Sequence, residues 1–107
     1  MALWKPPPVA EEPEITIINW SVMELPGDIR KFVGQDANGD GRVSSAIVKF
    51  DKRNRKGVTK SGRKYKLEGQ PGHSDNAEYV WRMMLARKNV DPTSVRDVTE
   101  EYRRDEL

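Results

Sequence analysis

The chain has 107 residues and a mass of 12.3 kDa, a length that fits one domain and leaves no room for two. Charged residues make up 34% of it, hydrophobic residues only 36%, and the mean hydropathy is −0.83, so we expect a thin core under a heavily charged surface. The absence of cysteine excludes disulfides, thiolate metal sites and a cysteine nucleophile, and no apolar run approaches the roughly 20 residues of a membrane span. With a single histidine, His73, we expect no metal, no cofactor and no catalytic residues.

Residues 1–14 contain four of the seven prolines and three glutamates. Because proline interrupts both helices and sheets, we interpret this segment as a flexible tail and expect a single ordered domain over residues 15–107. The segment lacks the basic and apolar regions of a signal peptide. We therefore expect a cytoplasmic protein that does not enter a membrane.

Three segments have the composition of β-strands. Residues 14–23, 42–50 and 63–67 are rich in β-branched or alternating apolar side chains and contain no Pro or Gly. Residues 25–28 and 36–41 carry turn signals, whereas residues 29–34 are too few to assign. The last two strands are expected to pair as an antiparallel hairpin, in which the alternation of residues 63–67 turns Tyr65 and Leu67 inward and the basic side chains largely outward.

A helix is the strongest local prediction. Asp75 is a good N-cap with Glu78 three residues later, and apolar residues recur after it at helical spacing. A second helix is expected from Asp97 to Glu106. The sequence thus predicts an α+β fold, with a small antiparallel sheet of three or four strands and a long helix (about 75–89) and a short C-terminal helix packed on one face.

The predicted core combines apolar residues of the strands with the inner side of the helix. It comprises Ile15, Ile17, Trp20, Val43, Ile47, Val48, Leu67, Val80, Trp81, Met84 and Leu85. The other side of the helix is also apolar, at Tyr79, Met83 and Ala86, so it needs a second cover. A homodimer through this helix face is one way to provide that cover.

Charge is distributed very unevenly along the chain. Residues 49–66 contain nine basic residues and one acid, a net charge of +8, whereas the remaining 89 residues carry −6. Such asymmetry indicates a binding partner of opposite charge. The candidate partner-binding residues on this basic hairpin (49–66) are Lys52, Arg53, Arg55, Lys56, Lys60, Arg63, Lys64 and Lys66.

Two kinds of partner fit the basic hairpin. Only Phe50 and Tyr65 lie near these charges, which is a weak pattern for stacking on single-stranded nucleic acid. An acidic protein surface explains more, because the acidic remainder of the chain would be repelled by nucleic acid and the apolar helix face suits a protein contact. We therefore expect a small non-enzymatic binding protein, an adaptor, regulator or inhibitor; the alternative is a nucleic-acid-binding module that grips phosphates.

Three further patterns have simpler explanations. Residues 36–44 resemble the first nine positions of an EF-hand calcium loop, but Ile47 stands where the closing glutamate is needed, so a turn is expected. The run from Gly57 to Gly62 lacks the Lys-Ser/Thr of a nucleotide-binding P-loop. His73, Asp75 and Glu78 form too small a set to fill acid, base and stabilising roles.

Overall fold

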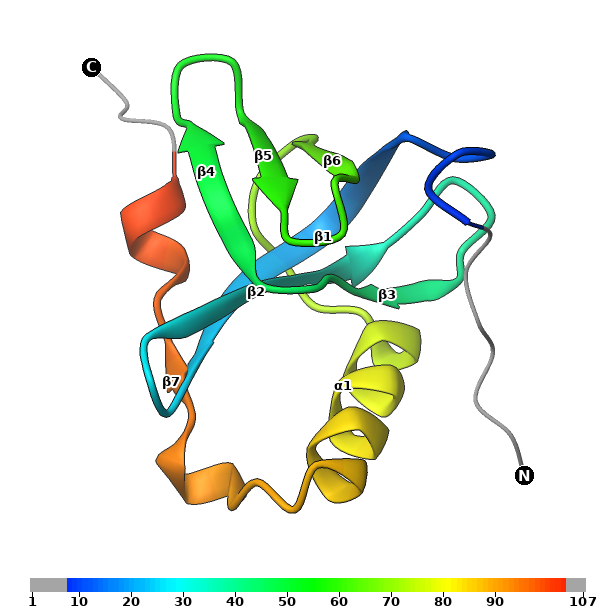
Figure 1. The fold of residues 1–107 in the computed structure, drawn as a ribbon. Coiled ribbons are helices and arrows are strands. Elements are labelled where there is room, and N and C mark those ends of the chain that lie inside the picture. Colours follow the sequence, from blue (N-terminus) through cyan, green and yellow to red (C-terminus); the bar gives the residue numbers. More distant parts are fainter. Residues whose placement is uncertain (1–7, 104–107) are drawn as a thin grey trace.

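The computed structural model describes residues 8–103, in which seven strands form one mixed sheet beside a single 13-residue helix (Figure 1). The strands are β1 (Glu14–Leu25), β2 (Ile29–Gln35), β3 (Gly41–Val43), β4 (Ile47–Asp51), β5 (Lys56–Thr59), β6 (Lys64–Leu67) and β7 (Arg96–Asp97). Their order is β3-β2-β1-β6-β5-β4, with β7 beside β1. The helix is α1 (Asp75–Arg87), and two 3₁₀ turns follow it, η1 (Pro92–Ser94) and η2 (Thr99–Tyr102).

The long strand β1 belongs to both halves of the sheet. Its first residues pair with β6 in parallel, and its later residues pair with β2 and β7 in antiparallel fashion. The register breaks between Ile18 and Ser21, where Asn19 has a positive φ of 48°. Such an irregularity bends a sheet, and β4 lies in contact with β2.

The space inside the bent sheet is filled by one aromatic-rich cluster. Phe32 on β2 lies at its centre, with ring centroids 5.6 Å from Tyr65, 6.0 Å from Phe50 and 6.3 Å from Tyr102. A Cβ at Gly57 would lie 2.3 Å from a Phe32 ring atom. The absence of a side chain at Gly57 is thus what allows β5 to pass over the ring.

The helix packs against β2 and β3 and forms a second cluster. Its buried side chains, Ala77, Trp81 and Leu85, meet Leu25 and Val33 of the sheet. The helix begins after the N-cap Ser74, whose hydroxyl accepts a hydrogen bond from the Ala77 N–H at 3.2 Å.

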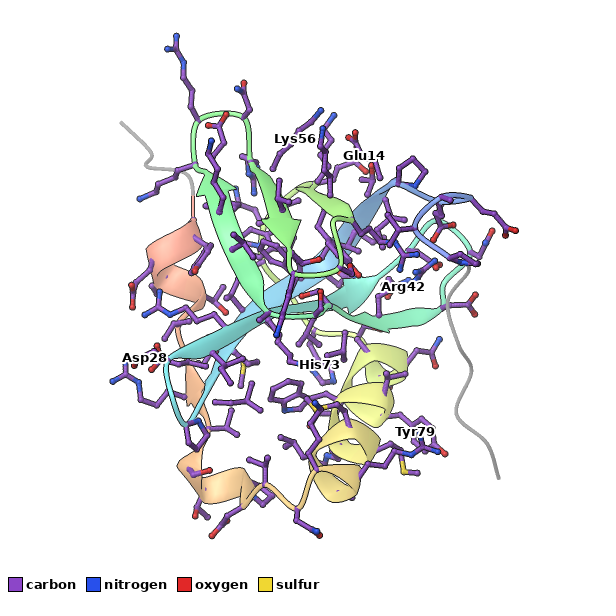
Figure 2. All side chains as sticks on the ribbon, viewed as in Figure 1. Glu14, Asp28, Arg42, Lys56, His73 and Tyr79 are labelled. Carbon is purple, nitrogen blue, oxygen red and sulfur yellow. The ribbon has the colours of Figure 1, made fainter. Side chains whose placement is uncertain are left out.

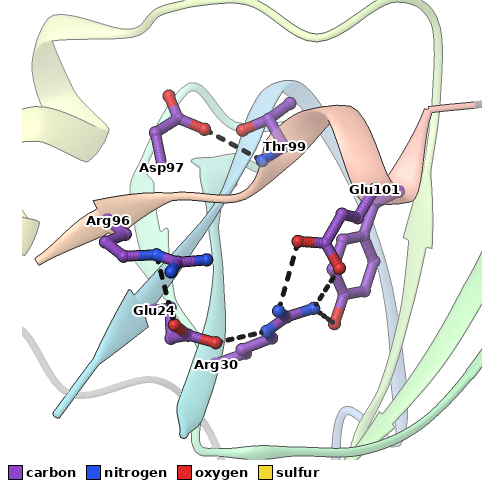
Figure 3. A network of polar contacts seen from close by, with 7 residues as sticks. Glu24, Arg30, Arg96, Asp97, Thr99 and Glu101 are labelled. Carbon is purple, nitrogen blue, oxygen red and sulfur yellow. Dashed lines mark hydrogen bonds and ion pairs between the residues drawn. The ribbon is translucent and has the colours of Figure 1, made fainter.

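The C-terminal segment is fastened across β1 by polar contacts (Figure 3). Arg30 donates to Glu24 at 2.8 Å and to Glu101 at 3.0 Å, and Arg96 lies 3.4 Å from Glu24. The Thr99 hydroxyl accepts a hydrogen bond from the backbone N–H of Val22 at 3.0 Å. These contacts hold η2 where it closes one end of the aromatic cluster.

The expected fold class is wrong about the number of strands in the sheet and about their directions. Seven strands form a mixed sheet rather than three or four antiparallel ones, and β1 and β6 pair in parallel. That pairing joins Glu14 to Lys64, far apart in sequence, so no local pattern could indicate it. The short segment left unassigned, residues 29–34, lies in a full strand.

The expected helices also need correction. The helix ends at Arg87 rather than near residue 89, because Asn89 adopts a positive φ of 54° and the chain turns. The predicted short C-terminal helix is instead β7 and the single turn η2; residues 104–106 of that prediction lie outside the described residues. Ser74, not Asp75, is the N-cap of α1.

Most of the predicted core is confirmed. Ile15, Ile17, Trp20, Leu67, Trp81 and Leu85 are buried, and Val43, Ile47, Val80 and Met84 are half-buried. Val48 was predicted wrongly, because it is 69% exposed at an irregularity in the β4–β5 register that turns it out of the regular alternation.

Replacing Trp81 tests the docking of the helix. Trp81 is 6% exposed, so Trp81→Ala should lower the free energy of unfolding by about 3–5 kcal/mol, measured by urea denaturation with circular dichroism. Tyr79→Ala on the same helix is the matched control, since Tyr79 is 49% exposed, and it should cost less than about 1 kcal/mol. Equal costs for the two variants would show that α1 does not pack as described.

Candidate binding surface

The outer face of β4, β5 and β6 carries most of the exposed lysines. Directly paired residues lie on the same side of a sheet, and the register gives two rows across this face. One row runs Lys49, Val58, Lys64 and Glu14, and the other runs Asp51, Lys56, Lys66 and Thr16. We call the four lysines around Val58, namely Lys49, Lys56, Lys64 and Lys66, the lysine face.

The lysine face is only partly neutralised. Lys56 lies 3.2 Å from Glu14, and both side chains remain about half exposed. Figure 2 shows these two side chains near each other at the end of the molecule remote from α1. Lys56 is also directly opposite Lys66, a cross-strand pair of like charges that disfavours folding. The register therefore places two like charges side by side on this face.

The β4–β5 turn extends this surface at the end of the molecule opposite to α1 (Figure 1). Asp51 fixes the turn by accepting hydrogen bonds from the backbone and side chain of Asn54, at 3.1 and 2.8 Å. These hydrogen bonds hold the pKa of Asp51 below its usual value. Lys52 and Arg53 lie exposed in the turn itself.

Two arginines of the basic segment face the protein instead. Arg55 donates from Nη2 to the Gly69 carbonyl at 2.6 Å, and its guanidinium lies 5.6 Å from the centre of the Trp20 ring. Arg63 is only 5% exposed and donates from Nε to the Glu12 carbonyl at 2.9 Å. Arg63 was expected among the outward basic side chains, yet alternation along residues 63–67 puts it on the same side as Tyr65 and Leu67, and the structure buries it there.

The segment before β1 is part of this arrangement. Besides its carbonyl contact with Arg63, Glu12 forms an ion pair with the buried Arg42, which also donates to Asp36 at 2.9 Å. Residues 8–13, which belong to the predicted tail, are therefore attached to the body, and residues 1–7 lie outside the described residues.

Lys60 lies apart from the lysine face. It is exposed in the turn between β5 and β6, and its backbone N–H donates to the Ala46 carbonyl at 2.7 Å. Lys60 lines a pocket together with Lys31 and Lys88, neither of which belongs to the lysine face. The candidate residues chosen from sequence thus divide into three groups: the lysine face with its turn, the inward arginines, and Lys60.

Local contacts account for the polar residues of the calcium-loop-like segment, residues 36–44, and for those around His73. Asp36 is buried, and one of its carboxylate oxygens accepts hydrogen bonds from the backbone of Asn38 and Asp40 while the other accepts from Arg42. His73 lies 3.0 Å from Asp75, and both side chains are exposed. Within residues 8–103, no group of three or more acidic, histidine or cysteine side chains is placed to hold a metal ion.

Single alanine variants of Arg55 and Arg53 test whether Arg55 stabilises the fold while Arg53 does not. Arg55→Ala removes a charged hydrogen-bond donor and a cation–π contact, and should lower the free energy of unfolding by about 1–3 kcal/mol. Arg53→Ala, the matched control two residues earlier, should change it by less than about 0.5 kcal/mol. Urea denaturation measures both, and an Arg55→Ala chain as stable as Arg53→Ala would refute the inward role.

Comparison with known proteins assigns no family to the chain. No family model matches it, and no similar protein is found among curated proteins or solved structures. No helix within residues 8–103 is long and apolar enough to cross a membrane. The function is therefore inferred from the surface residues themselves.

Proposed function

We propose that the protein is a non-enzymatic binding protein that docks on an acidic surface of a partner protein through the lysine face. The observation that carries the proposal is the position of Val58. This half-buried side chain is paired with Lys49 on one side and Lys64 on the other, and Lys56 precedes it by two residues on the same face. A small apolar centre with a charged rim is the usual anatomy of a protein–protein contact.

The lysines suit this role because each carries both an aliphatic stem and a mobile charge. The stems cover the apolar centre while the ammonium groups stay in water, ready to meet carboxylates. Charges at the rim of an interface accelerate association and select the partner more than they raise affinity. The turn residues Lys52 and Arg53 extend the positive surface beyond the sheet.

A protein partner is favoured over a nucleic-acid partner because the aromatic rings and most arginines of residues 49–66 are engaged inside the protein. Phe50 and Tyr65 both pack against Phe32 in the core, so neither ring is presented for stacking on bases. Two of the three arginines in residues 49–66 are bonded to backbone carbonyls, which leaves Arg53 for bidentate contacts to phosphate or guanine. The nucleic-acid alternative becomes an outcome of the test.

The exposed side of α1 supplies a second proposed contact, with another copy of this chain. Tyr79 points outward from the helix in Figure 2, Ala86 is exposed, and Met83 is half-buried. Ala86 also lines an apolar pocket of about 630 Å³ between α1 and the segment around Pro92. A homodimer would cover these residues without obstructing the lysine face.

Removal of two lysines tests the main proposal. Lys64→Gln/Lys66→Gln should weaken binding of fluorescent polyglutamate about tenfold at about 0.15 M salt, measured by anisotropy, because both ammonium groups face the partner. Arg82→Gln/Arg87→Gln on α1 is the control, since it removes the same net charge from exposed positions elsewhere and should leave binding unchanged.

A DNA duplex titrated in parallel decides between the two kinds of partner. We expect it to bind more weakly than polyglutamate at the same salt concentration. Tighter binding of the duplex, lost in Lys64→Gln/Lys66→Gln, would favour the nucleic-acid alternative, and equal losses in the lysine and arginine variants would refute a localised face.

The dimer contact has a separate test. Light scattering over a wide range of concentrations should show a concentration-dependent increase in mass, and Tyr79→Asp should abolish it, because a charge in the middle of the contact has no partner. Asn89→Asp beyond the end of the helix is the control. A constant monomer mass for the unmodified chain would refute the dimer.

A further inference from the structure

A pocket of about 390 Å³ on the helix side of β2 combines three lysines with an apolar wall. It is lined by Lys31, Lys60 and Lys88, by Ser45 and Ala46, and by Leu25, Pro26, Ile29 and Val90, and we call it the three-lysine pocket. The lysines come from three separate elements: β2, the β5–β6 turn and the end of α1. None of the lining residues carries a carboxylate.

Lys31 is the unusual member of this set. Its side chain is half-buried, yet within residues 8–103 its ammonium group has no hydrogen-bond or ion-pair partner, and the neighbouring charge that acts on it is the like charge of Lys88. Burial, and then the charge of Lys88, lower the pKa of Lys31. A partly desolvated ammonium beside a second one is unfavourable, and an anion would relieve both effects.

The remaining lining residues are suited to a ligand with a polar and an apolar end. The Ser45 hydroxyl accepts a hydrogen bond from the Ser61 N–H at 3.1 Å, which leaves its own hydrogen to donate to a ligand. On the opposite side the wall is hydrophobic, and Ile29 is 42% exposed. The volume is within the range of small-molecule sites.

From this arrangement we propose that the three-lysine pocket binds a small organic phosphate. Three ammonium groups and a hydroxyl match the charge and the acceptor oxygens of a phosphate dianion better than those of a single carboxylate. The organic part of the ligand lies against Leu25, Ile29 and Val90. This site is separate from the lysine face, and its occupancy does not depend on the protein partner proposed above.

Phenyl phosphate is the probe, because it joins a phosphate dianion to a compact apolar ring. Titrated into the full chain and followed by ¹H–¹⁵N NMR, it should shift the amide signals of Lys31, Ser45 and Val90 and saturate. Inorganic phosphate should bind about tenfold more weakly, since it cannot use the apolar wall. Absence of saturation, or equal affinity for the two anions, would overturn the proposal.

Matched variants locate the site. Lys31→Met keeps an unbranched stem and removes the charge, so it should weaken phenyl phosphate binding at least about tenfold. Lys66→Met makes the same change on the lysine face and should leave the affinity unchanged, even though it lowers polyglutamate binding. Equal weakening by both variants would indicate charge screening without a site and would overturn the proposal.

Thermal unfolding provides a second measurement. In the absence of ligand, Lys31→Met should melt at a higher temperature than the unmodified chain, because it removes an unpaired, half-buried charge. It should also lose the rise in melting temperature that phenyl phosphate produces. A lower melting temperature would mean that the ammonium is stabilised without an anion, which contradicts the proposal. Lys60→Met and Lys88→Met, both at exposed positions, test the ligand dependence independently of the packing at Lys31.

Discussion

The bend in β1 is the constraint on which the other features depend. A straight strand of twelve residues could pair with β2 and β6 along its whole length, but the register break at Ile18–Ser21 assigns its two ends to different halves of the sheet. Asparagine tolerates the left-handed conformation at position 19 better than most residues. Trp20 follows at once, fully buried, and its indole N–H donates to the Gly69 carbonyl that Arg55 also binds. Burial of Trp20 and its hydrogen bond to Gly69 thus stabilise the bend.

Because of that bend, two collections of lysines end up on different parts of the molecule. The lysine face is on the outer side of β4–β6, beyond the aromatic cluster, whereas Lys31 shares the side of β2 that meets α1. The first surrounds a half-buried valine on the outer side of the sheet; the second is a pocket with a hydrophobic wall. Charge of the same sign is therefore proposed to meet different ligands, an acidic protein surface at the lysine face and a compact anion at the three-lysine pocket.

Local patterns predicted the parts of the structure that local physics determines. The helical spacing placed Trp81 and Leu85 inward, and the alternation in residues 63–67 correctly placed Tyr65 and Leu67 in the core and Lys64 and Lys66 outside. The parallel β1–β6 pairing could not be predicted, because it joins residues 50 positions apart without a hairpin to fix the register. The three-lysine pocket was missed for the same reason, since Lys31 and Lys88 lie outside the basic segment and only the folded chain brings them to Lys60.

The basic segment also shows why counting charge along a sequence overstates the charge that a partner meets. Of the net +8 over residues 49–66, Arg63 is buried against the backbone of Glu12 and Arg55 is bonded across to Gly69, while Lys56 shares its charge with Glu14. The planar guanidinium, with its several donors, can serve a buried carbonyl and still pack on a ring, whereas the strongly hydrated ammonium prefers water. Two of the three arginines of the basic segment are accordingly used in internal contacts, whereas every described lysine except Lys31 is exposed. Lys31 departs from that pattern, because it is a half-buried ammonium without a counter-ion among the described residues, and this exception is the reason to look for its ligand.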